Sequence, residues 1–229
     1  MATIAANLQA VRARIEQAAS MAGRRADDIK LLAVSKTVAA ASIFEAYSAG
    51  QHAFGESYAQ EGVEKITKLA SMPDLEWHFI GPVQSNKTRA IAENFQWVHS
   101  IEREKIALRL NDARPPNLPP LEVCIEVNVS GERSKSGVAP GGEAPLAEAI
   151  AQLPRLRLRG LMAIPEPTSD TALQRRRFAL LRELAEKLAS RGYALDTLSM
   201  GMSDDFEAAI MEGATLVRIG TAIFGPRPR

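Results

Sequence analysis

Residues 31–36 read LLAVSK, a short apolar run that ends abruptly in a lysine. A run of this length that is apolar throughout is typical of a β-strand buried on both faces, as in a parallel sheet. Further short apolar runs recur along the chain. We therefore expect strands at residues 31–35, 52–54, 77–80, 97–99, 121–129, 157–163, 195–199 and 216–219.

Helix-like stretches separate these runs. Ala, Leu, Glu, Lys and Arg recur at helical spacing at about residues 40–50, 57–71, 86–95, 102–113, 143–153, 170–191 and 203–213. One more helix is expected over residues 3–21, before the first strand. Leu8, Val11 and Ile15 lie there at the spacing of one helix face.

The alternation of strands and helices indicates an α/β domain. Strands separated by helices pair in parallel through right-handed crossovers, and eight such units can close into a barrel without an open edge. An open doubly wound sheet is the alternative, but no GxGxxG signature follows the first strand. We predict a single (β/α)8 TIM barrel over residues 1–229 with an additional N-terminal helix, since roughly 200–250 residues are usual for such a domain.

The composition excludes several function classes. Lysine and arginine number 28 against 27 acidic residues, and a net charge of +1 gives no electrostatic reason to bind nucleic acid or an anionic membrane. No secretion signal is visible, and no run approaches the roughly 20 apolar residues that span a bilayer. Cys124 is the single cysteine, so it cannot form an internal disulfide. We expect a cytoplasmic, monomeric protein without a nucleic-acid or membrane partner.

Lys36 is the first candidate functional residue. The C-terminal ends of barrel strands meet on one face, where such folds place their sites. A lysine after a strand is often only a solvated charge. If Lys36 is instead partly desolvated, a lowered pKa supplies the neutral amine that Schiff-base formation requires. Lys36 is therefore a candidate for carbonyl chemistry.

The last two predicted strands end in residues suited to an anion. Gly201 and Ser203 follow the seventh strand, and Gly220 and Thr221 follow the eighth. Ser203 is expected to cap the next helix, and barrels frequently bind phosphate with the loops after strands seven and eight. The alternative is that Ser203 is simply a cap and Gly220 a turn residue. Two such groups of residues together favour a phosphate site.

Arg218 lies within the last predicted strand, LVRI at residues 216–219. The alternation of side chains along a strand places it either inside the barrel or outside beneath a helix. If it points inward, it can donate to the pyridine nitrogen of a cofactor joined to Lys36. An amine, a phosphate site and an inward cation together describe pyridoxal 5′-phosphate. An arginine at the ring nitrogen weakens this cofactor as an electron sink.

Long, specific segments extend this hypothesis. They are LLAVSKT (31–37), AFGESYAQE (53–61), EWHFIGPVQSNK (76–87), NVSGERSKSG (128–137), LRGLMAI (158–164), LSMGMSDDFEAAI (198–210) and VRIGTAIFG (217–225). Through these segments the chain resembles the YggS/PROSC family of pyridoxal-phosphate-binding proteins over essentially its full length. The resemblance implies a barrel like the N-terminal half of bacterial alanine racemase, with the cofactor on Lys36.

The resemblance also implies roles for single residues. Ser203, Gly220 and Thr221 match phosphate contacts of the family, and Arg218 matches the residue near the ring nitrogen. Ser57 stands in GESY, where the family commonly has asparagine in GENY, and a serine can still donate to phosphate. No residue is predicted to be catalytic. The predicted cofactor-binding residues are Lys36, Ser57, Met200, Ser203, Arg218, Gly220 and Thr221.

Family members are regarded as regulators of vitamin B6 and amino-acid homeostasis that hold or deliver the cofactor without a well-established reaction. The resemblance thus implies a carrier, with PLP-dependent apoenzymes as acceptors. A weak amino-acid racemase is the alternative, but it needs a second proton carrier opposite the lysine. In alanine racemase that tyrosine comes with an additional domain and a partner subunit, which we expect this chain to lack. A third hypothesis is aldolase-like chemistry of Lys36 on a phosphorylated sugar without cofactor.

Two other residues each have two interpretations. His78, on a predicted strand, either is satisfied in the core, which we favour, or faces the site. Lys135, after the fifth strand, is either a solvated charge or a second amine that accepts the aldehyde during transfer. His52 and His99 have no cysteine or carboxylate at ligand spacing, so we predict no metal site.

Overall fold

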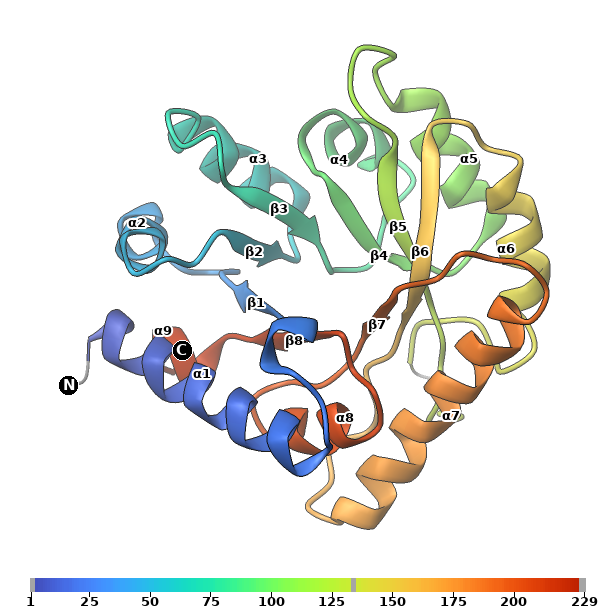
Figure 1. The fold of residues 1–229 in the computed structure, drawn as a ribbon. Coiled ribbons are helices and arrows are strands. Elements are labelled where there is room, and N and C mark those ends of the chain that lie inside the picture. Colours follow the sequence, from blue (N-terminus) through green and yellow to red (C-terminus); the bar gives the residue numbers. More distant parts are fainter. Residues whose placement is uncertain (1–2, 133–134, 227–229) are drawn as a thin grey trace.

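The computed structural model describes residues 3–132 and 135–226. Within these residues, eight parallel strands pair in chain order and β8 pairs with β1, which closes a barrel (Figure 1). The single (β/α)8 barrel is therefore confirmed, and the open doubly wound sheet is excluded. The strands are β1 (Lys30–Val34), β2 (Ala53–Glu56), β3 (Glu76–Phe79), β4 (Trp97–Ile101), β5 (Leu121–Glu126), β6 (Leu156–Met162), β7 (Thr197–Ser199) and β8 (Leu216–Ile219).

Helices surround the strands in Figure 1, and each predicted helix is present. The α-helices of the described residues are α1 (Ile4–Met21), α2 (Ala40–Ser48), α3 (Ala59–Lys68), α4 (Thr88–Asn94), α5 (Glu104–Ala113), α6 (Glu143–Ala151), α7 (Thr171–Ala189), α8 (Phe206–Met211) and α9 (Thr221–Phe224). The short helices at Ala26–Asp28 and Thr221–Phe224 were not predicted. Each is too short to show a helical period in the sequence.

The strand predicted at 121–129 ends earlier, at Glu126. The chain leaves the sheet there because it pairs with a returning loop. Val138 N donates to Glu126 O, and Asn128 N donates to Val138 O, both at 2.9 Å. The apolar character of Val127 and Val129 reflects burial of this loop. Burial alone therefore made the run resemble a longer strand.

The additional helix α1 completes the outer ring. The helix that follows β8, α9, has only four residues, and α1 lies beside it and beside α8 in Figure 1. Asn7 Nδ2 donates to Ile223 O of α9 at 2.8 Å. Arg14 pairs with Glu207 of α8 at 2.6 Å, and its guanidinium lies 4.5 Å from the ring centre of Phe206. Helix α1 thus covers the part of the barrel that α9 is too short to cover.

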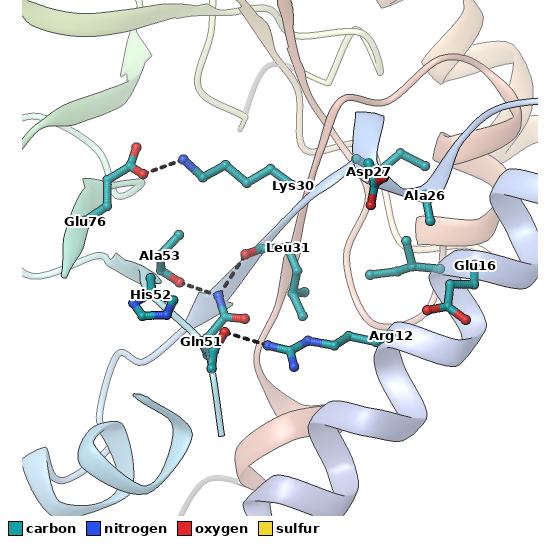
Figure 2. Close-up of a pocket in the computed structure, with 13 residues that line it drawn as sticks. Arg12, Glu16, Ala26, Asp27, Lys30, Leu31, Gln51, His52, Ala53 and Glu76 are labelled. Atoms are coloured by element: carbon teal, nitrogen blue, oxygen red, sulfur yellow. Dashed lines mark hydrogen bonds and ion pairs between the residues drawn. The ribbon is translucent and has the colours of Figure 1, made fainter. Parts of the chain in front are cut away.

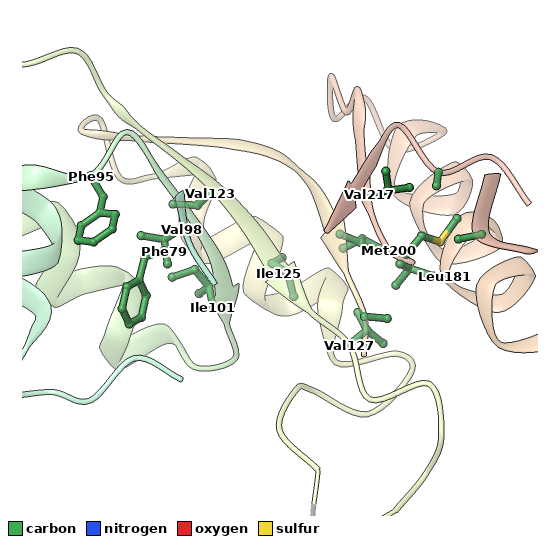
Figure 3. Close-up of a cluster of buried hydrophobic side chains, with 14 of the residues drawn as sticks. Phe79, Phe95, Val98, Ile101, Val123, Ile125, Val127, Leu181, Met200 and Val217 are labelled. Carbon is green, nitrogen blue, oxygen red and sulfur yellow. The ribbon is translucent and has the colours of Figure 1, made fainter. Parts of the chain in front are cut away.

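The main hydrophobic core lies between the strands and the helices, and Figure 3 shows part of it. Inside the barrel are two smaller apolar clusters, one of Leu32, Ala53 and Leu216 and one of Trp97, Cys124 and Met162. Polar side chains are also buried within the same barrel, among them those of His78, His99, Ser199 and Arg218. The interior is therefore partly polar. No helix in the described part of the chain is long and apolar enough to cross a membrane.

Candidate functional site

The C-terminal ends of the strands surround a cavity of about 210 Å³. Six of the predicted cofactor-binding residues line it, namely Lys36, Ser57, Ser203, Arg218, Gly220 and Thr221. The structure thus brings an amine from the first βα unit together with hydroxyl groups from the last two. The remaining lining residues are Val34, Ile80, Ile164, Met202 and Asp204.

The backbone is fixed on both sides of Lys36. Ser35 Oγ donates to Glu56 Oε1 at 2.6 Å. Thr37 has φ 63°, a left-handed conformation that a β-branched residue rarely adopts, and its amide donates to Glu61 Oε1 at 2.6 Å. Strain of this kind persists only where the surroundings hold it, and it is common at functional sites.

Lys65 connects these two sides. Its Nζ donates to Ser35 O at 2.6 Å, to Glu56 Oε1 at 2.9 Å and to Glu61 Oε1 at 2.6 Å. Burial raises the pKa of Glu56, and the hydrogen bonds from Ser35 and Lys65 oppose that rise. This network was not predicted from the sequence. Its only signal was the spacing of Glu61 and Lys65, four residues apart on a predicted helix.

Gly220 and Thr221 form the start of α9. Ile223 N and Phe224 N each donate to Gly220 O at 2.9 Å, and the amides before them precede the first hydrogen bonds of the helix. Such amides suit an anion. A Cβ atom on Gly220 would lie 3.0 Å from Val34 O, so glycine allows the ends of β8 and β1 to approach closely.

Ser203 lines the cavity but does not cap α8. The predicted capping role is wrong, because the N-cap of α8 is Asp205, and Ser203 lies in the turn that precedes the helix. Asp205 Oδ1 accepts from the Met202 amide at 2.6 Å. Gly201 has φ 93°, and a Cβ atom there would lie 2.7 Å from Ala209 Cβ. The turn at Gly201, rather than a helix cap, therefore positions Ser203.

Arg218 points into the barrel, one of the two predicted orientations. Its Nη1 donates to Ser199 O at 2.6 Å and to Ser199 Oγ at 2.8 Å, and its Nη2 donates to Ala163 O at 2.8 Å. Burial lowers the pKa of Arg218 to about 10, opposed by the charges of Asp205 and Glu126. The group is therefore a cation at neutral pH. A guanidinium has five N–H donors, so three bonds do not exhaust its capacity toward the cavity.

Met200 and Ser57 differ in their placement. Met200 is fully buried among core side chains that include Leu181 and Val217, and it does not line the cavity (Figure 3). Because Ser199 points into the barrel, the next side chain points outward. Ser57 does line the cavity. A Cβ atom on Gly81 would lie 2.2 Å from Ser57 O, so the loop after β3 packs directly on this residue.

The structure assigns His78 to the barrel core, the interpretation favoured from sequence. Its Nδ1 lies 2.9 Å from His99 Nε2, and its Nε2 lies 3.1 Å from Glu76 Oε1. The second of these approaches is poorly aligned for a hydrogen bond. Burial lowers the pKa of His78 in spite of the glutamate.

Lys135 lies beside the candidate site. Its Nζ donates to Ile164 O at 3.2 Å and lies 3.7 Å from Glu132 Oε2. It lines a hollow of about 230 Å³ that shares Ile80 and Ile164 with the Lys36 cavity. Residues 133–134 of the same segment lie outside the described residues. A role in transfer remains a prediction.

The barrel matches a known class of domain. The family profile described as "Alanine racemase, N-terminal domain" matches residues 6–228. Among solved structures, alanine racemase from Corynebacterium glutamicum is similar with a TM-score of 0.69 and 19% identity, over 97% of this chain and 62% of that chain. The class is thus an alanine racemase N-terminal barrel.

Relatives of full length narrow the family. The chain is 63% identical over 227 residues to the pyridoxal phosphate homeostasis protein of Pseudomonas aeruginosa, covering 99% of this chain and 97% of that protein. It is 55% identical to the Escherichia coli protein of the same name, covering 99% and 98%. PipY of Synechococcus elongatus, solved with PLP bound, is 36% identical with a TM-score of 0.81 over 93% of this chain and 100% of that chain. The chain belongs to the pyridoxal phosphate homeostasis protein family.

Proposed function

We propose that this protein binds pyridoxal 5′-phosphate in the cavity at the C-terminal ends of its strands and serves in the homeostasis of this cofactor and of amino acids. The observation that carries the proposal is the convergence of Lys36, Ser203, Arg218 and Thr221 on one cavity. The names of the curated relatives and the PLP-bound structure of PipY support it.

The chemistry of the lining residues fits each part of the cofactor. Lys36 Nζ would bond to the aldehyde carbon, with loss of water. The hydroxyl groups of Ser203 and Thr221 and the first amides of α9 would hold the phosphate, and Ser57 would add a donor. The ion-pair network around Lys65 fixes the backbone on both sides of Lys36 and so directs its amine.

Arg218 favours holding the cofactor over catalysis. When bound, pyridoxal phosphate supplies an electron sink for amino-acid chemistry. A guanidinium can only donate hydrogen bonds, so Arg218 at the ring nitrogen would oppose protonation there and weaken that sink. We infer a carrier that delivers the cofactor to PLP-dependent apoenzymes without turnover of its own. In this proposal residues 1–229 form a single PLP-binding domain that is a cytoplasmic monomer.

The visible spectrum tests the proposal. Wild-type protein incubated with pyridoxal phosphate and then freed of unbound cofactor by gel filtration should absorb in the visible, and borohydride should bleach it and leave the reduced cofactor on Lys36. Lys36→Ala should stay colourless. Wild-type protein that stays colourless would refute cofactor binding. Colourless protein that borohydride traps only with a sugar phosphate would favour the aldolase-like hypothesis instead.

Proton exchange tests the absence of turnover. In deuterated water, the carrier should leave the α-proton of alanine in place even at high protein concentration. Rapid exchange that Lys36→Ala abolishes would establish a racemase-type activity. This measurement separates the carrier from the racemase, which the visible spectrum cannot do.

Lys135 is the second amine of the proposed carrier. Its position beside the cavity supports a role in accepting the aldehyde during release. Lys135→Met keeps much of the side-chain volume and removes the amine. Slower transfer of cofactor to an apoenzyme is expected, and an unchanged rate would remove Lys135 from the proposal.

A further inference from the structure

A chain of polar groups crosses the barrel interior. Arg218 Nη1 lies 2.8 Å from Ser199 Oγ, which lies 2.8 Å from His99 Nδ1. His99 Nε2 lies 2.9 Å from His78 Nδ1, and His78 Nε2 faces Glu76 Oε1 at 3.1 Å. Strands β4 and β7 are not neighbours in the barrel, so the bond between His99 and Ser199 spans the interior. This series of polar groups, called the polar chain below, joins the candidate site to the N-terminal mouth of the barrel.

The middle of this chain is shielded from water. His78, His99 and Ser199 are fully buried, and His78 stacks on Trp97 with ring centres 5.2 Å apart. Burial lowers the pKa of both histidines, and the positive charge of Arg218 lowers that of His99 further. Both rings are therefore neutral at physiological pH. A neutral imidazole has one N–H donor and one acceptor nitrogen.

The Arg218 end determines the direction of donation. A guanidinium only donates, so Ser199 Oγ accepts from Arg218. The serine hydroxyl then donates to His99 Nδ1, which places the His99 proton on Nε2. That proton is donated to His78 Nδ1, which places the His78 proton on Nε2, toward Glu76.

The negative charge of Glu76 near His78 Nε2 favours the same direction. Glu76 lines the hollow of about 360 Å³ at the N-terminal ends of the strands, and its Oε2 lies 2.5 Å from Lys30 Nζ (Figure 2). Burial would raise the pKa of Glu76, but His78 and Lys30 together lower it to about 2. An ionised carboxylate only accepts. In the reversed chain, an acceptor nitrogen of His78 would face this carboxylate.

We propose that Glu76, His78, His99 and Ser199 are positioning residues that hold Arg218 as a fixed hydrogen-bond donor toward the ring nitrogen of the cofactor. The inference rests on the proposed function for the identity of the ligand, while the direction of the chain is a property of the protein alone. If the direction of donation were reversed, the proton of the Ser199 hydroxyl would point at the Arg218 guanidinium and would displace that guanidinium. The carboxylate at one mouth thus orients the donor at the other.

Nitrogen NMR of the two rings tests the direction without any cofactor. In protein labelled with ¹⁵N-histidine and freed of ligand, His78 and His99 should both be neutral Nε2–H tautomers between pH 6 and about 8. Ser199→Ala should change the His99 signals most. An Nδ1–H tautomer or a doubly protonated ring at either position overturns the directed chain. This result is independent of whether the protein binds pyridoxal phosphate.

Binding by matched variants tests the positioning role. His99→Phe breaks the chain at similar volume, and it should raise the Kd for pyridoxal phosphate roughly tenfold and shift the absorption maximum of the bound cofactor. His99→Gln keeps one acceptor and one donor and should restore most of the affinity. Cys124→Ala changes a buried side chain in the same barrel that is not part of the polar chain, and this variant should bind like the wild type.

Three outcomes separate failure of the positioning role from failure of the proposed function. A folded His99→Phe protein with wild-type Kd and absorption maximum overturns the positioning role. If His99→Phe does not fold, Ser199→Ala removes a single oxygen and should show the same spectral shift, and its absence overturns the role equally. Wild-type protein that never binds pyridoxal phosphate refutes the proposed function instead, and leaves the NMR result standing.

Discussion

The two mouths of the barrel each hold a lysine from the same region of chain, and the two lysines have different surroundings. Lys30, at the start of β1, pairs with Glu76 at 2.5 Å and lies 5.9 Å from the ring centre of Trp97. Lys36, just after β1, lines a cavity together with Arg218 and several hydroxyl side chains. An ion pair with Glu76 holds the first amine at the N-terminal mouth. The second amine belongs to a residue that lines the cavity proposed for an anionic carbonyl compound.

Two glutamates, one at each mouth, repeat this contrast. At the N-terminal mouth, His78 and Lys30 outweigh the effect of burial and lower the pKa of Glu76 to about 2. At the C-terminal mouth, burial and then the charge of Glu102 raise the pKa of Glu126 to about 7. The carboxyl group at the N-terminal mouth therefore ionises more readily than an ordinary glutamate, and the one at the C-terminal mouth ionises less readily.

Replacing each of the two lysines in turn should give the largest effect and is the strongest test of the contrast. Lys36→Ala should abolish the visible absorbance that pyridoxal phosphate gives the protein, because the covalent link is lost. Lys30→Ala removes the same group from the other end of β1 and should retain that absorbance. Spectra recorded after gel filtration measure both. Equal loss in the two variants would mean that the absorbance follows fold integrity rather than a specific amine.

The hydroxyl groups of the cavity should have the next largest effect. Each hydrogen bond to a charged group contributes about 1.5–3 kcal/mol, so the double change Ser203→Ala and Thr221→Val should raise the Kd for pyridoxal phosphate roughly a hundredfold. The spectrum of the saturated protein should be preserved, since Lys36 remains. Ser48→Ala, which removes an exposed hydroxyl on α2, is the control. A Kd unchanged by the double substitution would exclude these hydroxyls from phosphate binding.

The sequence predicted the barrel because its strands are short apolar runs and its helices are amphipathic, and both patterns are local. The cavity residues were also predictable, since the C-terminal ends of parallel strands converge. Lys36 and Thr221 are far apart in the chain, yet the topology alone brings them to one face.

Contacts across the barrel could not be predicted in the same way. His99 and Ser199 are 100 residues apart, and the alternation of side chains does not say which strands face each other across the interior. The outward placement of Met200 depends on the inward placement of Ser199, which becomes apparent only once Arg218 is seen to bond to that serine. The capping role expected of Ser203 failed because the chain continues to turn as far as Asp205.

Glu126 should make the C-terminal mouth sensitive to alkali. Its pKa is raised from 4.5 to about 7, so its stabilising contribution is present below pH 4.5 and is lost as pH rises through about 7. Glu126→Gln should therefore gain about 3 kcal/mol in unfolding free energy over the wild type between pH 4.5 and 8. Urea unfolding of both proteins at several pH values measures this difference. A constant difference across that range would show that Glu126 titrates normally.

Glu76 should give a pH dependence of stability that is opposite in sign to that of Glu126 and smaller. The two glutamates together are therefore the sharpest comparison of the two mouths. Its pKa is lowered from 4.5 to about 2, so its stabilising contribution is present above pH 4.5 and is lost as pH falls toward 2. Because its side chain is 30% exposed, water screens the effect, and the wild type should exceed Glu76→Gln by only about 1 kcal/mol at pH 7. Glutamine still offers a carbonyl oxygen to His78, so the substitution removes the charge and keeps an acceptor. The difference in unfolding free energy should shrink on acidification, whereas that of Glu126→Gln grows with alkali. Slopes of the same sign in the two variants would mean that the mouths are electrostatically alike, and the distinction between Lys30 and Lys36 would then need another cause.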